Sequence, residues 1–236
     1  MTATRWTWLV MVAVWGLFFS WYTSFGGPLT DEEIEQYLGQ ADSMVPAPAP
    51  EKIDQLRRFM QEDTGDDFVM INIGEEYDRP LPIEGVEPGQ STERVLANYM
   101  AYVWPALLSR ASHPVQFGTA ASTAIEVLNA DGMEVWDNTV SMRYRSRRDF
   151  MGFVSDPRMP PAHAFKVASI KKTIVFPADP WFHLGDPRFV LGLLLGLIGC
   201  ALSWGFAVRA GSNGPIDRAE DTWSTTPPST RSRRPK

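Results

Sequence analysis

The chain of 236 residues has one cysteine, three histidines and no surplus of positive charge, and each shortage excludes a class of protein. Cys200 alone leaves no partner for an intrachain disulfide and no set of thiolates for a zinc cage. The histidines stand at none of the spacings, such as HxH or HExxH, that bring two imidazoles to one metal ion. A net charge of −6 is opposite to the basic balance typical of nucleic-acid binding, so no nucleic-acid partner is expected.

Sequence motifs that identify a particular class of reaction are also absent. The sequence has no glycine-rich phosphate loop and no Ser-His-Asp arrangement that spacing supports. The acidic pairs 66–67 and 75–76 lack the repeated Asp/Asn spacing of a calcium loop and are typical of solvated turns. We therefore predict no metal site and no cofactor.

Charge is absent from two long runs, residues 6–25 and 189–208. About 20 helical residues span the ~30 Å hydrocarbon core of a bilayer, because each residue adds about 1.5 Å. Trp and Tyr near both ends of the first run are typical of the aromatic belts at membrane interfaces. We predict two transmembrane helices, and the absence of charge inside both argues against a transporter. A cleaved signal peptide with Arg5 as its basic region is the alternative for 6–25, but no small-residue cleavage site follows.

The second run contains four glycines, each of which weakens a helix in water by about 1 kcal/mol relative to alanine. In a membrane, small residues let two helices approach closely. The predicted helix-packing stripe consists of Gly192, Gly196, Gly199 and Ser203. Glycine that is merely frequent in such helices, without a packing role, is the alternative.

The segments outside the two runs differ in charge. Residues 26–187 hold 14 Lys or Arg against 25 Asp or Glu, whereas the tail 209–236 holds six basic and three acidic residues. The positive-inside rule then places both termini in the cytoplasm and the centre outside, although Arg188 points the other way. We predict a multi-pass protein of the cell (inner) membrane with an extracytoplasmic central domain. The tail, rich in Ser, Thr, Pro and Arg, is predicted to be disordered.

The central part divides into a connector, 26–66, and a folded domain, 67–178, before a juxtamembrane segment, 179–188. In the connector, Thr30 and Glu33 have the spacing of a capping box, so a short helix should begin there. Apolar residues recur at helical spacing over 51–62, after a Pro-rich stretch typical of a stiff linker.

In the domain, apolar periodicity predicts six elements in the order β-α-β-β-α-β. They are a strand at 68–73, a helix at 92–111, one interrupted strand or a pair at 115–118 and 124–128, a strand at 139–145, a helix at 147–154 and, after a turn at 162–168, a strand at 170–176. This order is that of the ferredoxin-like motif. The expected fold class is α+β, a ferredoxin-like domain flanked by two transmembrane helices.

The same residues resemble the dimeric α/β-barrel superfamily, and most of all its small uncharacterised domains. The likeness covers 67–178 and rests on the helix with Tyr99 and Pro105, the run Ser146-Arg-Arg-Asp-Phe-Met-Gly-Phe-Val-Ser-Asp-Pro-Arg, and the closing Ala168-Ser-Ile-Lys-Lys-Thr-Ile-Val-Phe-Pro. Met159 replaces the aromatic residue common after Asp-Pro in those domains. The resemblance implies a homodimer with two sheets face to face. It leaves the reaction open, because oxygenases, haem enzymes and lactone isomerases share the fold.

Three residues are candidates for catalysis: His163, Arg143 and Tyr99. His163 follows the second domain helix, where the superfamily's cleft opens, and suits a haem ligand or general base; a surface or capping histidine is the alternative. A pocket lined by all three would favour an enzyme of oxygenase or isomerase type.

A second set, Arg143, Arg145 and Tyr102, is a candidate for ligand binding. Two arginines on one strand face can clamp a carboxylate or phosphate through bidentate bonds. The alternative is a solvated face, or an ion pair with Glu126.

The expectation that combines these features is a membrane-anchored domain that dimerises and binds a small ligand or acts as a scaffold. A tethered enzyme is one alternative, and an accessory subunit packed on other membrane subunits is another. An interior filled by Met142, Phe150 and Phe153 would favour the scaffold.

Overall fold

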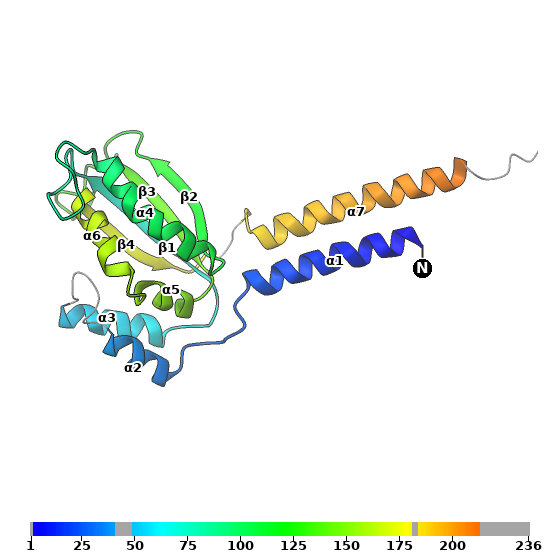
Figure 1. The fold of residues 1–236 in the computed structure, drawn as a ribbon, viewed down its shortest axis with the longest axis horizontal. Helices are drawn as coiled ribbons and strands as arrows, with labels where there is room; N and C mark the ends of the chain where they lie inside the picture. Colours follow the sequence, from blue (N-terminus) through cyan, green and yellow to red (C-terminus); the bar gives the residue numbers. More distant parts are fainter. Residues whose placement is uncertain (1, 41–48, 181–183, 213–236) are drawn as a thin grey trace, which may run out of the picture.

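The structure is a computed structural model that describes residues 2–40, 49–180 and 184–212. Within these residues the chain forms a mixed α+β domain from which two long helices project side by side (Figure 1). The predicted α+β class is confirmed. Most of the Pro-rich linker, His183 and the tail from residue 213 onwards lie outside the described residues.

The domain is built on one four-stranded sheet in which every neighbouring pair is antiparallel. Its strands are β1 (Phe68–Glu76), β2 (His113–Thr119), β3 (Asn138–Tyr144) and β4 (Ile170–Ala178), in the spatial order β2-β3-β1-β4. In the register of β1 and β3, Met70 lies opposite Met142, and Val69 lies opposite Arg143. Because side chains alternate along a strand, the methionines share one face and Arg143 lies on the other.

Three helices belong to the domain: α4 (Thr92–Leu108), α5 (Arg147–Val154) and α6 (Met159–Ser169). The methionine face of the sheet packs on α4 and α5. The core cluster consists of Phe68, Met70, Val103, Ala106, Leu107, Met142, Tyr144 and Phe153. Ser91 and Ser146 cap α4 and α5, because each side chain accepts a hydrogen bond from the backbone N–H three residues further on.

Two sequence expectations within the domain are wrong. Residues 162–168 were expected to form a turn but lie in α6, which begins with prolines in its first turn, where proline is tolerated. Ala162 and Ala168 are buried there, and α6 packs against α4. The expected strand at 124–128 does not form: Ile125 is fully exposed and no sheet neighbour reaches this segment.

The other face of the sheet carries a strip of aliphatic and aromatic side chains. Val69, Ile71 and Ile73 lie opposite Ala178, Phe176 and Ile174 of β4. Ile174 and Phe176 remain 37% and 43% exposed. We call this strip the open sheet face.

The connector forms the two helices that its sequence predicts, α2 (Asp31–Gly39) and α3 (Pro50–Gln61). The predicted capping box is confirmed: Thr30 Oγ1 accepts from Glu33 N, and the Glu33 carboxylate accepts from Thr30 N at 2.8 Å. A second buried cluster, of Leu29, Ile34, Met60 and Met151, packs both helices against α5.

The two projecting helices, α1 (Ala3–Tyr22) and α7 (Pro187–Ser212), run antiparallel (Figure 1). Of the helices that the structure describes, one segment, Pro187–Gly211, is long and apolar enough to cross a membrane. The first helix forms as expected, but its mean hydropathy is too low for it to count as a membrane-spanning helix. Four tryptophans, Tyr22 and Arg5 lower that mean hydropathy. Two spanning helices are therefore not established by composition.

The small-residue stripe of α7 contacts α1 of the same chain. A Cβ added at Gly192 would lie 3.1 Å from Trp15 Nε1, and one at Gly199 would lie 3.0 Å from Trp8 Cη2. Trp8 Nε1 also donates to Ser203 Oγ at 3.1 Å. Two tryptophan rings of α1 thus pack against two glycines of α7. By contrast, nothing lies within 4 Å of a Cβ at Gly196.

The close approach at Gly199 predicts a position-specific effect of a large side chain. We expect Gly199→Leu to separate the helices and to destabilise the protein by about 1–3 kcal/mol through overpacking. Gly205→Leu is the matched control, because it gains the same helix propensity where nothing lies within 4 Å. Thermal unfolding in detergent micelles measures both. Equal melting temperatures for the two variants would refute the packing.

Candidate functional site

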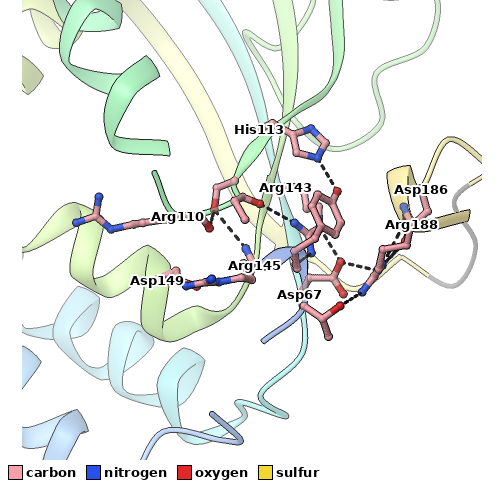
Figure 2. A network of polar contacts seen from close by, with 12 residues as sticks. Asp67, Arg110, His113, Arg143, Arg145, Asp149, Asp186 and Arg188 are labelled. Carbon is pink, nitrogen blue, oxygen red and sulfur yellow. Dashed lines mark hydrogen bonds and ion pairs between the residues drawn. The ribbon is translucent and has the colours of Figure 1, made fainter. Parts of the chain in front are cut away.

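Two regions of the domain are candidates for function: a cluster of charged residues and a cavity. The cluster lies where the helix pair meets the domain (Figure 2). Arg143, on β3, is 3% exposed and donates three hydrogen bonds. They go to Asp67 Oδ2 at 2.7 Å, Ala111 O at 2.8 Å and Tyr22 O at 3.0 Å. Its guanidinium also lies 3.6 Å from the ring centroid of Tyr22. Arg143 therefore fastens the end of α1 to the sheet.

Asp67 links the second projecting helix to the same point. Its Oδ2 also accepts from Nη2 of Arg188, at the start of α7, at 3.1 Å, and Arg188 is paired with Asp186. The hydroxyl of Tyr22 is hydrogen-bonded to His113 Nε2 at 2.5 Å. We call Tyr22, Asp67, His113, Arg143 and Arg188 the junction. It holds both helix ends against β2 and β3.

Arg145 has a similar role at the edge of the junction (Figure 2). It pairs with Asp149 at 2.7 Å and donates to Trp21 O at 3.1 Å. Neither this arginine nor Arg143 has an ion pair with Glu126 in the described part of the chain. Both guanidiniums bind carboxylates and backbone carbonyls of the chain itself, so the structure does not present the two arginines as a free anion clamp.

Tyr102 also lies apart from the expected clamp. Its hydroxyl donates to Phe153 O at 3.4 Å, and the guanidinium of Arg158 lies 5.6 Å from its ring centroid. The predicted binding set of Arg143, Arg145 and Tyr102 is therefore not brought together.

The second region is a cavity between α4, α6 and the methionine face of the sheet. One part has a volume of about 500 Å³ and is bounded by α5 and α6. The other has a volume of about 390 Å³ and extends along α4. Residues that line both parts are Asn72, Tyr99, Tyr144, Lys166, Ile170 and Thr173. The two volumes therefore meet at a shared wall, and we call them together the domain cavity.

Two of the predicted catalytic residues meet in the domain cavity. The rings of Tyr99, on α4, and His163, on α6, lie edge to face with centroids 6.2 Å apart. Burial raises the pKa of Tyr99 and holds its phenol in the neutral form. Arg143 is absent from the lining because it lies on the opposite face of the sheet.

Lys166 is the lining residue that sequence reasoning missed. It lies one helical turn beyond His163 on α6, with its ammonium 5.8 Å from the ring centroid of Tyr99. Burial lowers the pKa of Lys166, because the charged form loses its hydration. The sequence signal for this residue is a lysine within the largely apolar stretch 162–168. The turn expected there gave no reason to place that lysine in a cavity.

The remaining lining determines which chemistry the domain cavity can support. Phe150, Phe153 and Met142 contribute to its walls, so they line the space without filling it. Lys171 and Lys172, at the β4 side, both pair with Glu75, at 2.5 Å and 3.1 Å. The lining contains no Asp, Glu, Cys or Ser among the described residues. The cavity is thus a largely aromatic and aliphatic space whose polar lining includes His163 and the half-buried Lys166.

No family model matches the chain, and no curated protein matches its sequence. A solved structure of a protein of unknown function from Rhodopseudomonas palustris is similar at 18% identity and a TM-score of 0.46, over 58% of this chain and 96% of that one. A hydroxynitrile lyase from Passiflora edulis is similar at 15% identity and a TM-score of 0.34, over 52% and 98% of the two chains. A protein from Arabidopsis thaliana is similar at 12% identity and a TM-score of 0.32, over 49% and 97%. Similarities of this size assign neither a family nor an activity.

Proposed function

We propose that the chain is a small-ligand-binding protein held at the cell membrane by α1 and α7, with its domain outside the cytoplasm. The domain cavity carries the ligand-binding part of the proposal. Its larger part, about 500 Å³, lies within the range of small-molecule sites, and an apolar lining with a few polar groups is typical of them.

The membrane anchor is supported by the surface of the helix pair. Large apolar side chains on both helices point outward: Leu17 is 74% exposed, Leu197 is 68% exposed and Trp204 is 75% exposed. An apolar surface of this extent is unfavourable in water and typical of a membrane-facing segment. Because α1 packs along α7, a bilayer that surrounds α7 also surrounds α1.

The antiparallel arrangement supports the predicted orientation. The beginning of α1 and the end of α7 lie at the same end of the pair, away from the domain (Figure 1). Arg5 and the end of α7, which the basic tail follows in sequence, therefore lie on the same side, and the positive-inside rule favours the cytoplasm for that side.

A ferredoxin-like fold and a homodimer complete the proposal. The observed order β1-α4-β2-β3-α5-α6-β4 and the strand order β2-β3-β1-β4 support the ferredoxin-like assignment. The open sheet face supports the dimer. A second copy anchored in the same bilayer presents the same face at the same height, so a two-fold axis normal to the membrane pairs the two faces.

Binding is favoured over catalysis by the contents of the domain cavity. Tyr99 and His163 meet there without Arg143, and the described lining offers no carboxylate to act as a base. The hydroxyl of Thr173 donates to Ile73 O at 2.8 Å and is committed to the sheet. A tethered enzyme of oxygenase or isomerase type, or an accessory subunit, remains the alternative reading of the same domain.

Ligand binding is tested by native mass spectrometry of the full chain released from mild detergent. We expect a bound small molecule in the wild type and its loss in Val167→Trp, which places an indole at the wall of the domain cavity. Val135→Trp is the matched control, because Val135 is equally exposed, at 44%, and lies in the 120–137 loop. A wild-type chain without bound mass, in repeated preparations, would count against a ligand-binding function.

Dimerisation through the open sheet face is tested by light scattering in detergent. We expect the wild type to have the mass of two chains and Phe176→Glu to have the mass of one, because a carboxylate in a paired apolar face is desolvated without a partner. Ile125→Glu is the control, since Ile125 is fully exposed in a loop. A dimer that survives Phe176→Glu would rule out this face.

The orientation is tested by protease accessibility in sealed cells. External protease should cleave the exposed 120–137 loop of the domain in intact cells while it leaves the tail uncut. Cleavage of the domain only after the cytoplasm is opened would reverse the topology.

A further inference from the structure

Lys166 differs from several other cations of the domain, which are paired with carboxylates. Lys171 and Lys172 share Glu75, and Arg143, Arg145 and Arg188 each bind a carboxylate. Lys166 has no carboxylate within 4.0 Å in the described part of the chain, and its ammonium lies over the face of the Tyr99 ring, 5.8 Å from the centroid. An aromatic face supplies about 0.5–2 kcal/mol to a cation, less than the hydration that burial removes.

The domain cavity offers a position for a counter-ion of Lys166. The side chain lines both parts of the cavity, so a molecule in either part reaches the ammonium. Burial already lowers the pKa of this amine, and a bound anion would reverse that shift by favouring the cationic form. A ligand with a negative group therefore offsets the desolvation of this amine.

Most other polar groups of the cavity wall are already bound to groups of the protein itself. Asn72 Nδ2 donates to Met70 O at 3.0 Å and to Val140 O at 3.3 Å, and Thr173 Oγ1 donates to Ile73 O. Lys171 and Lys172 pair with Glu75, and Asn138 Nδ2 donates to Glu76 Oε1 at 2.8 Å. Apart from His163, most of the remaining wall is aromatic or aliphatic. A ligand that fits has one anionic group at Lys166 and an apolar body elsewhere.

We propose that the domain cavity binds amphipathic carboxylates, with the Lys166 ammonium as the partner of the carboxylate and the aromatic wall around the apolar body. This inference rests on the proposed ligand-binding function and names the class of its ligand. The lining comes from α4, α5, α6 and the sheet, and none of it from α1 or α7. Tyr99 positions the amine through its ring face and offers its neutral hydroxyl as a second donor.

The test uses the full chain in nanodiscs and three probes with one apolar body: 4-phenylbutyrate, 4-phenylbutan-1-ol and 4-phenylbutylamine. Calorimetric titration should show that the carboxylate binds at least about tenfold more tightly than the alcohol. A hydrogen bond to a charged group increases binding affinity by at least about this factor. The amine should bind most weakly, because it places a second cation beside Lys166.

Three variants assign the preference to Lys166. Lys166→Met keeps the apolar volume and should bind carboxylate and alcohol alike, while Lys166→Arg should retain the preference. An unchanged affinity of Lys166→Met for the alcohol shows that the cavity is still folded. Lys52→Met is the matched control, because Lys52 is exposed on α3, and it should behave as the wild type.

The pH dependence gives an independent readout. Carboxylate affinity should fall as the pH rises through the lowered pKa of Lys166, while alcohol affinity stays level. Equal binding of carboxylate and alcohol by the wild type would overturn the carboxylate class and leave a ligand site in place. A preference that survives Lys166→Met would also overturn it. Failure of all three probes to bind would overturn both this inference and the proposed function.

Discussion

The ion pair between Asp67 and Arg143 is the constraint on which the arrangement of the molecule depends. Arg143 is almost fully buried, so its charge requires compensation, and Asp67 supplies it immediately before β1. The same carboxylate contacts Arg188 at the start of α7, and the same guanidinium binds the last carbonyl of α1. One pair thus fixes the ends of both projecting helices to the sheet. The hydrogen bonds of Tyr22 with His113 and of Arg145 with Trp21 O reinforce the same attachment.

The two faces of the sheet separate anchoring from binding. Arg143 and Met142 are neighbours in sequence, yet one points to the junction and the other toward the domain cavity. This division follows from the alternation of side chains along β3. It lets the chain place buried charge beside the anchor while the opposite face stays apolar enough to line a ligand site. The same alternation leaves the open sheet face available to a second copy.

Much of the fold was predictable because its signals are local. The capping box at Thr30 and Glu33, the bounds of α5 and the starts of β1 and β4 follow from residues close together in the chain. α6 was missed because two prolines at its first turn have the pattern of a loop. The role of Arg143 was not predictable from sequence, because two of its three acceptors are backbone carbonyls that only the fold brings near. Lys166 was hidden for the same reason: burial of one side chain depends on how α6 meets α4 and the sheet.

The central claim, that the junction joins anchor and domain into one unit, is tested most directly by a double-mutant cycle on Asp67→Asn and Arg143→Met. The free energy of unfolding of the full chain in detergent is measured for the wild type, both single variants and the double variant. We predict a coupling energy of about 1–3 kcal/mol, because the second substitution removes a buried charge that the first left unpaired. Effects that add to within about 0.3 kcal/mol would contradict the account.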